Sequence, residues 1–533
     1  MSLPLLSRER RDVTSPGVYR IEVLSVCRPV VLLFGFFLLA YSYGLDNAAR
    51  NTYETCALSS FKEHSLTSTV GVIQTVIGAA AQPTAAKLAD VTSTRSRVLF
   101  SYLPALPYII NTWVSGNVAS AVLARTSWKW GIGMWALITP VASLPLIANL
   151  LVVSRRARKM GLLTEAETAA PARVNRGVAR LAYDLFWLLD VVGIVLVIAV
   201  LGLILVPFTL AGGIHEQWSQ AHIIAPVMVG VTCIPVFVLW ERWAPHPLLP
   251  FALLRDRSVW APIGIAIFLD FSYVMPADYL FTVLRVAFDF SVTASTRITT
   301  LYSFASILTG PFVGFAVFAI AGTVLYLVAF GLLIRYRGSI LGHGRAGMIG
   351  AQVLLGIAGG IFPYAAQASM QINVRHEHLA SVTGVEKAAG WLGSALGDTV
   401  SGALWTQLLP GLLEADLASV NATLAPVAYA DPLYEIVPIY PLGTPERSGV
   451  IHAYQYIQRI LVITGLCLCV PLIVFSLVLR SQKLTDDQTL VQDDGAVQAA
   501  HKEIELADQD ADTVAAAAGA RPEAAAAAAA AEA

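Results

Sequence analysis

Long apolar runs recur along most of this chain, and they constrain its fold more than any other feature. Hydrophobic residues make up 56% of the 533 residues and charged residues only 13%, a balance that a water-exposed surface does not tolerate. Each run is about 20 residues long, which as a helix crosses the roughly 30 Å hydrocarbon core of a bilayer. The sequence therefore predicts an all-α, polytopic membrane protein, because helices satisfy their own backbone hydrogen bonds in lipid.

The number of such runs predicts about twelve membrane spans. The predicted ranges are 29–46, 66–89, 98–118, 130–153, 186–211, 222–240, 259–277, 298–317, 319–334, 346–370, 380–408 and 457–479. Lysine and arginine residues near helix ends stay in the cytoplasm. With the N-terminus inside, the predicted inner segments carry Lys87, Arg95, Arg97, Arg155, Arg156, Arg158, Lys159, Arg242, Arg255 and Arg257. The outer segment 212–221 has no lysine or arginine, so the charge distribution supports this topology. Arg335, Arg337 and Arg345 are exceptions, because this topology puts them on the outer face of the membrane.

The predicted topology divides the chain into five parts. These are a cytoplasmic N-terminal segment at 1–28, an N-terminal helix bundle at 29–153, a cytoplasmic linker at 154–185, the remaining spans and C-terminal bundle at 186–480, and a cytoplasmic tail at 481–533. The tail is acidic and then almost pure alanine, so we expect it to be disordered. An outer loop at 410–455 holds Asn421, which opens an acceptor pattern for N-glycosylation.

Charge and motifs exclude several other classes of protein. The net charge is −1, and the basic residues form short blocks between apolar runs, so nucleic-acid binding has no support. We find no nucleophile with its base and no phosphate-binding glycine loop. His376 and His378 flank Glu377 on a predicted inner loop, and a solvated loop explains them better than a metal site. We expect no enzyme activity, no cofactor and no metal, and a monomer surrounded by membrane lipid.

Ionisable residues within or at the ends of the predicted spans are informative, because burying a charge in hydrocarbon costs a few kcal/mol or more. They are Asp46, Asp190, Asp270, Asp278, Asp289, Glu386, Lys387 and Asp398. Any one of them also fits an interfacial residue wetted by lipid headgroups. As a set they indicate a polar path through the bundle, where a partly desolvated carboxylate can take up and release a proton.

Two charged pairs have more than one interpretation. Arg285 lies four residues before Asp289, and an ion pair one helical turn apart explains that spacing better than direct substrate contact does. Glu386 and Lys387 are adjacent, so on a helix they point about 100 degrees apart and pair poorly with each other. Each of these two residues therefore needs another partner.

Glycines gather in two of the predicted spans. Gly356, Gly359 and Gly360 share one span, and Gly390, Gly393, Gly397 and Gly402 share the next. Small residues at such spacings allow helices to approach closely. We interpret the pattern first as a packing signal and second as a sliding surface for conformational change.

Several stretches of the chain resemble one protein family, over most of residues 17–485. They include AYSYGLDNAARNTYETCALSS at 40–60, SYLPALPYIINTWVSGNVASAVL at 101–123, APHPLLPFALLRDRSVW at 244–260, DYLFTVLRVAFDFSV at 278–292 and RAGMIGAQVLLGIAGGIFPYAAQAS at 345–369. These strings are together highly specific. They are similar to those of the fungal siderophore-iron transporters of the major facilitator superfamily.

The resemblance implies a two-bundle fold and proton-coupled import of ferric hydroxamate siderophores by alternating access, across a plasma membrane or an endosomal or vesicular membrane. A related branch exports glutathione in exchange for protons. By the match to the family's motifs, Asp46 and Asp278 are expected to couple protons, with Tyr279, Tyr302, Gln367 and Tyr454 lining the substrate path. Asp289 is a further candidate for proton coupling. Arg285 and Arg50, which with Asp46 closes the predicted first span, are further candidates for substrate binding.

The chain departs from the family in three places. The family usually has fourteen spans, and two of them are missing near residue 91, where Asp90 runs almost directly into TSTRSRVLFSY. A second gap lies between Gly314 and Ala321, where the family has a basic inner loop. The charged sequence VEKAAGW at 385–391 stands where the family has an aromatic, uncharged helix. Errors in the gene model explain the two gaps better than a genuinely shortened protein does.

Three functions stay open from the sequence. The first is a proton-coupled importer of ferric siderophores. The second is an exchanger of glutathione or a drug-like solute for protons. The third, which the two gaps favour, is a non-transporting membrane receptor or inactive remnant that binds ligand without moving it.

Overall fold

The structure is a computed structural model and is helical throughout the residues that it describes. These are residues 29–88, 106–159, 189–212, 217–244, 256–310, 316–336, 344–374 and 379–479, with residues 183, 186, 187 and 248. The all-α prediction is confirmed. The N-terminal segment 1–28, most of the linker 154–185, the tail 481–533, the histidines at 376 and 378 and the departures from the family near 91 and 315 lie outside the described residues.

Each of the twelve predicted runs overlaps one long helix. These helices are α2 (Pro29–Ser60), α3 (Thr67–Leu88), α5 (Pro107–Arg125), α7 (Trp135–Lys159), α10 (Val191–Leu210), α11 (Ala221–Trp243), α12 (Arg257–Ala277), α14 (Val292–Thr309), α15 (Ala316–Arg335), α16 (Arg345–Asn373), α17 (Leu379–Leu417) and α19 (Pro445–Val478). Short helices join them: η1 (His64–Leu66), α6 (Trp128–Gly133), α13 (Leu280–Val286), α18 (Leu424–Ala430) and η5 (Pro432–Ile436). Within the described residues, 7 helical segments are long and apolar enough to cross a bilayer. The chain is therefore a multi-pass membrane protein.

Several predicted boundaries are wrong, because polar segments continue as helix. α2 runs to Ser60 rather than ending at 46, since the intervening residues include no proline or glycine that would break it. The predicted outer loop 410–455 is shorter, because α17 continues to Leu417 and α19 begins at Pro445. The Thr444 side chain caps α19 by accepting a hydrogen bond from the Arg447 amide.

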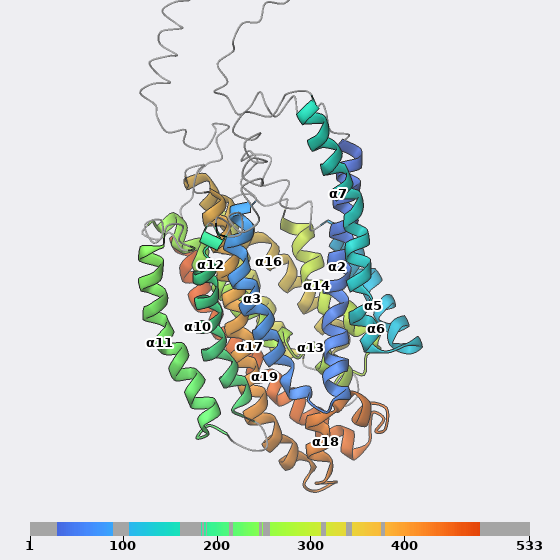
Figure 1. Cartoon of the computed structure of the whole chain (residues 1–533). Coiled ribbons are helices and arrows are strands. Elements are labelled where there is room, and N and C mark those ends of the chain that lie inside the picture. The colour runs from blue at the N-terminus through green and yellow to red at the C-terminus, as the bar shows by residue number, and fades with distance from the viewer. Residues whose placement is uncertain are drawn as a thin grey trace, which may run out of the picture.

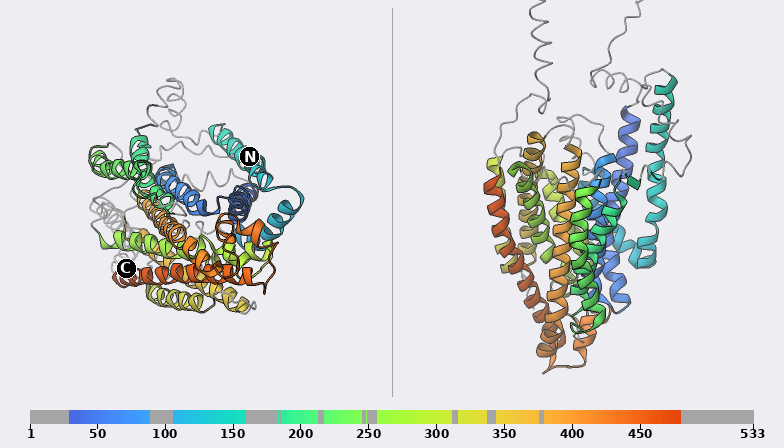
Figure 2. Two further views of the ribbon diagram at one scale, coloured as in Figure 1. Left: turned by 90° about the horizontal axis from the view of Figure 1, so that it is seen from below. Right: turned by 60° about the vertical axis from the view of Figure 1, so that its left-hand side comes forward.

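The helices run between two ends of the molecule (Figure 1). We call one the basic end, because α7 finishes there in the sequence Arg155-Arg156-Ala157-Arg158-Lys159; α2 also begins at this end, which is at the top of Figure 1. The other, which we call the opposite end, holds α18. The helices spread apart at the basic end and converge toward the opposite end (Figure 2).

The helices form a smaller and a larger group. α5, α6 and α7 pack against α2, whereas α12, α14, α15, α16, α17 and α19 pack against one another. α3 joins the larger group, because it packs chiefly against α17 and α10 rather than against α2. α5 meets α14 and so joins the two groups.

Glycines bring the central helices into close contact. A side chain at Gly393 of α17 would overlap the Ile267 carbonyl of α12, and one at Gly402 would overlap Ser68 of α3. Gly360 of α16 lies in the same way against α14. The close helix approach predicted from the glycine spacing is confirmed at these positions.

The contact at Gly393 gives a test of this packing. We predict that Gly393→Leu lowers the stability of the purified protein by about 1–3 kcal/mol, because the added side chain forces α17 away from α12. The readout is the thermal unfolding midpoint in detergent. Gly411→Ala on the same helix is the matched control, since nothing lies within 4 Å of an added Cβ there. Equal midpoints for both variants and the wild type would contradict the prediction.

Candidate functional site

A cavity of about 610 Å³ lies between the two groups of helices. The larger group lines it from α12, α14, α16 and α17, and the smaller group from α2 and α5. The lining includes Asn47, Asn51, Tyr108, Asp270, Tyr273, Tyr302, Gln367, Glu386, Lys387 and Trp391. On α14, α16 and α17 these residues belong to the half of the helix nearest the basic end. The volume is typical of a small-molecule binding site, roughly 300–1,000 Å³.

Three charged side chains meet at the cavity wall. Lys387 Nζ lies 3.4 Å from Glu386 Oε2 and donates to Gln367 Oε1 at 3.4 Å. Asp270 reaches across from α12 to lie against Gly390 of α17. The prediction that Glu386 and Lys387 pair poorly is wrong, because both side chains are long enough to converge although their Cα–Cβ bonds diverge. The prediction of another partner is confirmed for Lys387, which has Gln367.

Aromatic side chains form another part of the wall. Tyr273 and Tyr302 stack with their ring centroids 4.0 Å apart. Tyr302 and Gln367, two of the residues predicted to line the substrate path, thus lie at the cavity. Their contact with substrate stays a prediction.

Four aromatic side chains, which we call the aromatic plug, lie beyond the cavity toward the opposite end: His64, Tyr279, Trp405 and Tyr454. The Tyr279 and Trp405 rings stack with centroids 3.8 Å apart, and Tyr454 meets Trp405 edge-on. None of the four is more than 1% exposed. Tyr279 is also hydrogen-bonded to Ser68 of α3. Tyr279 and Tyr454, predicted to line the path, therefore lie in the plug and not in the cavity lining.

Two carboxylates, the partly buried Asp278 and the buried Asp398, lie between the cavity and the plug, where α3, α12 and α17 meet. Ser401 donates to Asp278 Oδ2 at 2.7 Å, and Thr75 donates to Asp398 Oδ2 at 3.2 Å. Within the described residues, neither carboxylate lies within 4.0 Å of a cationic group. Of the two, Asp278 was expected to couple protons.

Asp46 and Arg50 lie in the middle of α2 and not at the end of a span, because α2 continues to Ser60. They form an ion pair of 2.6 Å, and Arg50 also lies 4.0 Å from Glu54. Neither Asp46 nor Arg50 lines the cavity, although their neighbours Asn47 and Asn51 do.

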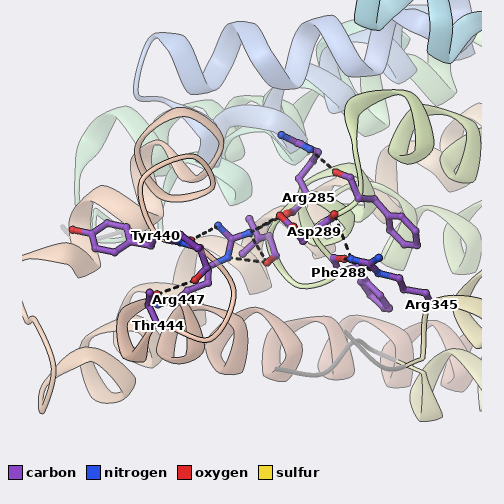
Figure 3. Close-up of polar contacts among 10 residues, drawn as sticks. Arg285, Phe288, Asp289, Arg345, Tyr440, Thr444 and Arg447 are labelled. Carbon is purple, nitrogen blue, oxygen red and sulfur yellow. Dashed lines mark hydrogen bonds and ion pairs between the residues drawn. The ribbon is translucent and has the colours of Figure 1, made fainter. Parts of the chain in front are cut away.

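The predicted ion pair between Arg285 and Asp289 is wrong. Arg285 donates to the Phe290 carbonyl instead, and Asp289 lies 3.8 Å from Arg447 (Figure 3). The helical spacing does not apply, because α13 ends at Val286 and Asp289 has a positive φ of 51°. Both residues lie near the opposite end, away from the cavity lining.

Two arginines that were not among the predicted site residues hold this turn. Arg447, only 1% exposed, donates to the carbonyls of Arg285 and Val286, and Arg345 donates to the Phe288 carbonyl at 2.7 Å (Figure 3). Carbonyls at the end of a helix lack intrahelical partners. Their need for donors cannot be seen in a pattern of charged residues.

The charged part of the cavity was recognised only in pieces. Asp270, Glu386 and Lys387 were predicted from the sequence to be charges within spans, but they were not assigned to a site. A signal was present in the spacing, because Glu386, Gly390 and Ser394 follow one another every four residues and so share a helix face. All three line the cavity.

Asn421 lies between α17 and α18 at the opposite end and is partly buried. Its side-chain oxygen accepts a hydrogen bond from the Thr423 hydroxyl at 2.7 Å. The two residues of the acceptor pattern are therefore in contact, and glycosylation there stays a prediction.

Burial of His64 in the plug gives a prediction about pH. Burial lowers the pKa of His64 to about 3, since a charged imidazole would lose its hydration. The unfolded chain binds this proton below a pKa of about 6.5 and the folded chain does not, so stability falls as the pH drops through that range. We predict that His64→Gln loses less thermal stability than the wild type between about pH 7.5 and about pH 5. The exposed His222→Gln is the control; a wild-type pH dependence in His64→Gln would contradict the prediction.

Comparison with known proteins identifies the family. No family model matches the chain. Siderophore iron transporter 1 of Saccharomyces cerevisiae is 38% identical, over 91% of this chain and 87% of that protein. Siderophore iron transporter ARN1 of the same yeast is 37% identical, over 86% and 82%.

Solved structures are more distant, and the curated relatives decide the assignment. A bacterial homologue of the human lysosomal transporter Spinster covers 86% of this chain and 97% of its own, at 15% identity and a TM-score of 0.40, too low to carry an argument. The two yeast proteins match at well above 30% identity over most of both chains. The chain therefore belongs to the siderophore iron transporter family of the major facilitator superfamily.

Proposed function

We propose that this chain imports ferric siderophores of the hydroxamate type, coupled to protons. The observation that carries the proposal is the cavity of about 610 Å³ between the two groups of helices, in a chain 38% identical to a siderophore iron transporter. A compact chelate fits a site of this size. Tyrosine rings and amide side chains in the lining suit a ligand with an apolar outer surface and polar amide groups.

Alternating access is the proposed mechanism. On α14, α16 and α17 the cavity lining belongs to the half of each helix nearest the basic end, while the aromatic plug lies toward the opposite end. This arrangement supports a state open toward the basic end. Release of the plug and closure of the basic end would then expose the same site to the other side.

Asp278 is our first candidate for coupling protons. It lies between the cavity and the plug, where it accepts a hydrogen bond from a hydroxyl group and has no cationic partner among the described residues. Loss of its proton therefore creates a negative charge that no neighbouring described cation neutralises. Asp46 is a weaker candidate, because Arg50 neutralises it at 2.6 Å. Asp289 is partly exposed and near Arg447, which fits a structural role better.

The non-transporting alternative has one observation in its favour. α3 packs mainly against the larger group rather than against α2. A smaller group that lacks α3 has fewer helices with which to rock as a unit. The same experiment therefore has to separate binding from movement.

We predict proton-dependent uptake. Cells that lack their own siderophore uptake, expressing this chain, accumulate labelled ferric trihydroxamate, and a protonophore abolishes the accumulation. Asp278→Asn lowers uptake by about ten-fold or more, because a permanently neutral side chain cannot complete a proton cycle. The control is Asp416→Asn, which removes a carboxylate near the opposite end that pairs with His452.

Other outcomes select other functions. Uptake that is indifferent to the proton gradient contradicts proton coupling. Net efflux of the solute favours an exchanger, and binding without uptake favours the receptor-like alternative.

A further inference from the structure

The cavity wall carries very few charges, and they are unevenly balanced. Among the lining residues within the described chain, the charged ones are Asp270, Glu386 and Lys387. There is one ammonium for two carboxylates. Whether Asp270 is protonated or ionised, the wall has no surplus of positive charge.

Glu386 and Lys387 balance each other inside the cavity. The Glu386 side chain is only 8% exposed, and its Oε2 makes no hydrogen bond within the described residues. Lys387 lies 3.4 Å from that oxygen and is 48% exposed, so its ammonium also faces the open space of the cavity. Removal of either partner would therefore change the net charge of the cavity wall by one unit.

Among the described residues, three arginines outside the cavity lining already have partners of their own. On α2, Arg50 is paired with Asp46 and Glu54. Arg285 and Arg447 are committed to backbone carbonyls near the opposite end. Among the described residues, its own three charged side chains therefore contribute most to the electrostatic potential in the cavity, because a nearby charge in a poorly hydrated site acts more strongly than a distant, paired one.

We propose that Glu386 and Lys387 together select substrates by charge, so that the cavity accepts neutral or cationic ferric chelates and rejects anionic ones. This inference rests on the proposed function, since it assumes that the chelate occupies this cavity. An anionic chelate would meet two carboxylates and an ammonium that Glu386 already neutralises. A neutral chelate avoids that repulsion, and a terminal cation on the chelate is attracted to Asp270 and Glu386.

Single substitutions should move the preference in opposite directions. Glu386→Gln removes one negative charge from the wall and shifts the preference toward anionic chelates, whereas Lys387→Met removes its one positive charge among the described residues and shifts the preference toward cationic ones. A unit charge within several ångströms of the ligand changes the ratio between the uptake rates of two differently charged chelates by about ten-fold, at an intermediate effective dielectric. The double variant removes both charges at once, so its preference should return toward that of the wild type.

The experiment compares one chelate scaffold at three charges. The probes are a linear ferric trihydroxamate with a free terminal amine, the same molecule with that amine acetylated, and the same molecule with that amine succinylated; their net charges are positive, zero and negative. Iron-labelled uptake and equilibrium binding to the purified protein are both measured for the wild type, the two single variants and the double variant. Lys62→Met and Glu435→Gln are matched controls, because that ion pair of 3.6 Å lies outside the cavity.

The two measurements keep the proposals distinguishable. We expect the wild type to bind the cationic and neutral probes at least about ten-fold better than the anionic one, and the single variants to shift that ratio in opposite directions. Charge ratios that are the same in all cavity variants and both controls overturn the inference, even if uptake is normal. Binding with the expected ratios but no uptake of any probe supports the inference and contradicts the proposed transport. Absence of binding to the wild type overturns both.

Discussion

The close packing of α17 between α3 and α12 is the contact on which the rest of the structure depends. Glycines on α17 let it touch the backbone of α12 at Ile267 and the side chain of Ser68 on α3. That contact fixes the position of α17, which runs from the cavity to the aromatic plug. α17 carries Lys387 at the cavity, Asp398 between the cavity and the plug, and Trp405 in the aromatic plug. A movement of α17 would therefore change cavity, carboxylates and plug together.

The cavity and the plug are two consequences of the way the helices spread. The helices diverge toward the basic end, and the space between the two groups is lined there by polar and aromatic side chains (Figure 2). They converge toward the opposite end, where stacked rings such as Tyr279 and Trp405 exclude water. Between the two lies Asp278, which accepts a hydrogen bond from the hydroxyl group of Ser401. The same geometry thus places an acid that has no cationic partner among the described residues next to the plug.

The positions of the long helices could be predicted from the sequence, because apolar runs of sufficient length leave few alternatives in lipid. Helix ends could not, since polar stretches such as 47–60 continue α2 without an apolar signal. Resemblance to the family singled out Tyr302 and Gln367, which line the cavity, but it did not indicate that Tyr279 and Tyr454 lie in the plug. The Glu386–Lys387 pair and the capping by Arg447 depend on side-chain reach and on backbone carbonyls, which residue spacing does not encode.

The most direct test of this account asks from which side the cavity is reached. In a variant without the 5 native cysteines, Ser394→Cys places a thiol in the cavity lining. A membrane-impermeant thiol reagent is applied to intact cells and to inverted vesicles, with and without a ferric trihydroxamate. We expect labelling from the side of the basic end, and protection by the chelate. Labelling from the opposite side alone, or labelling that the chelate does not slow, would contradict the account.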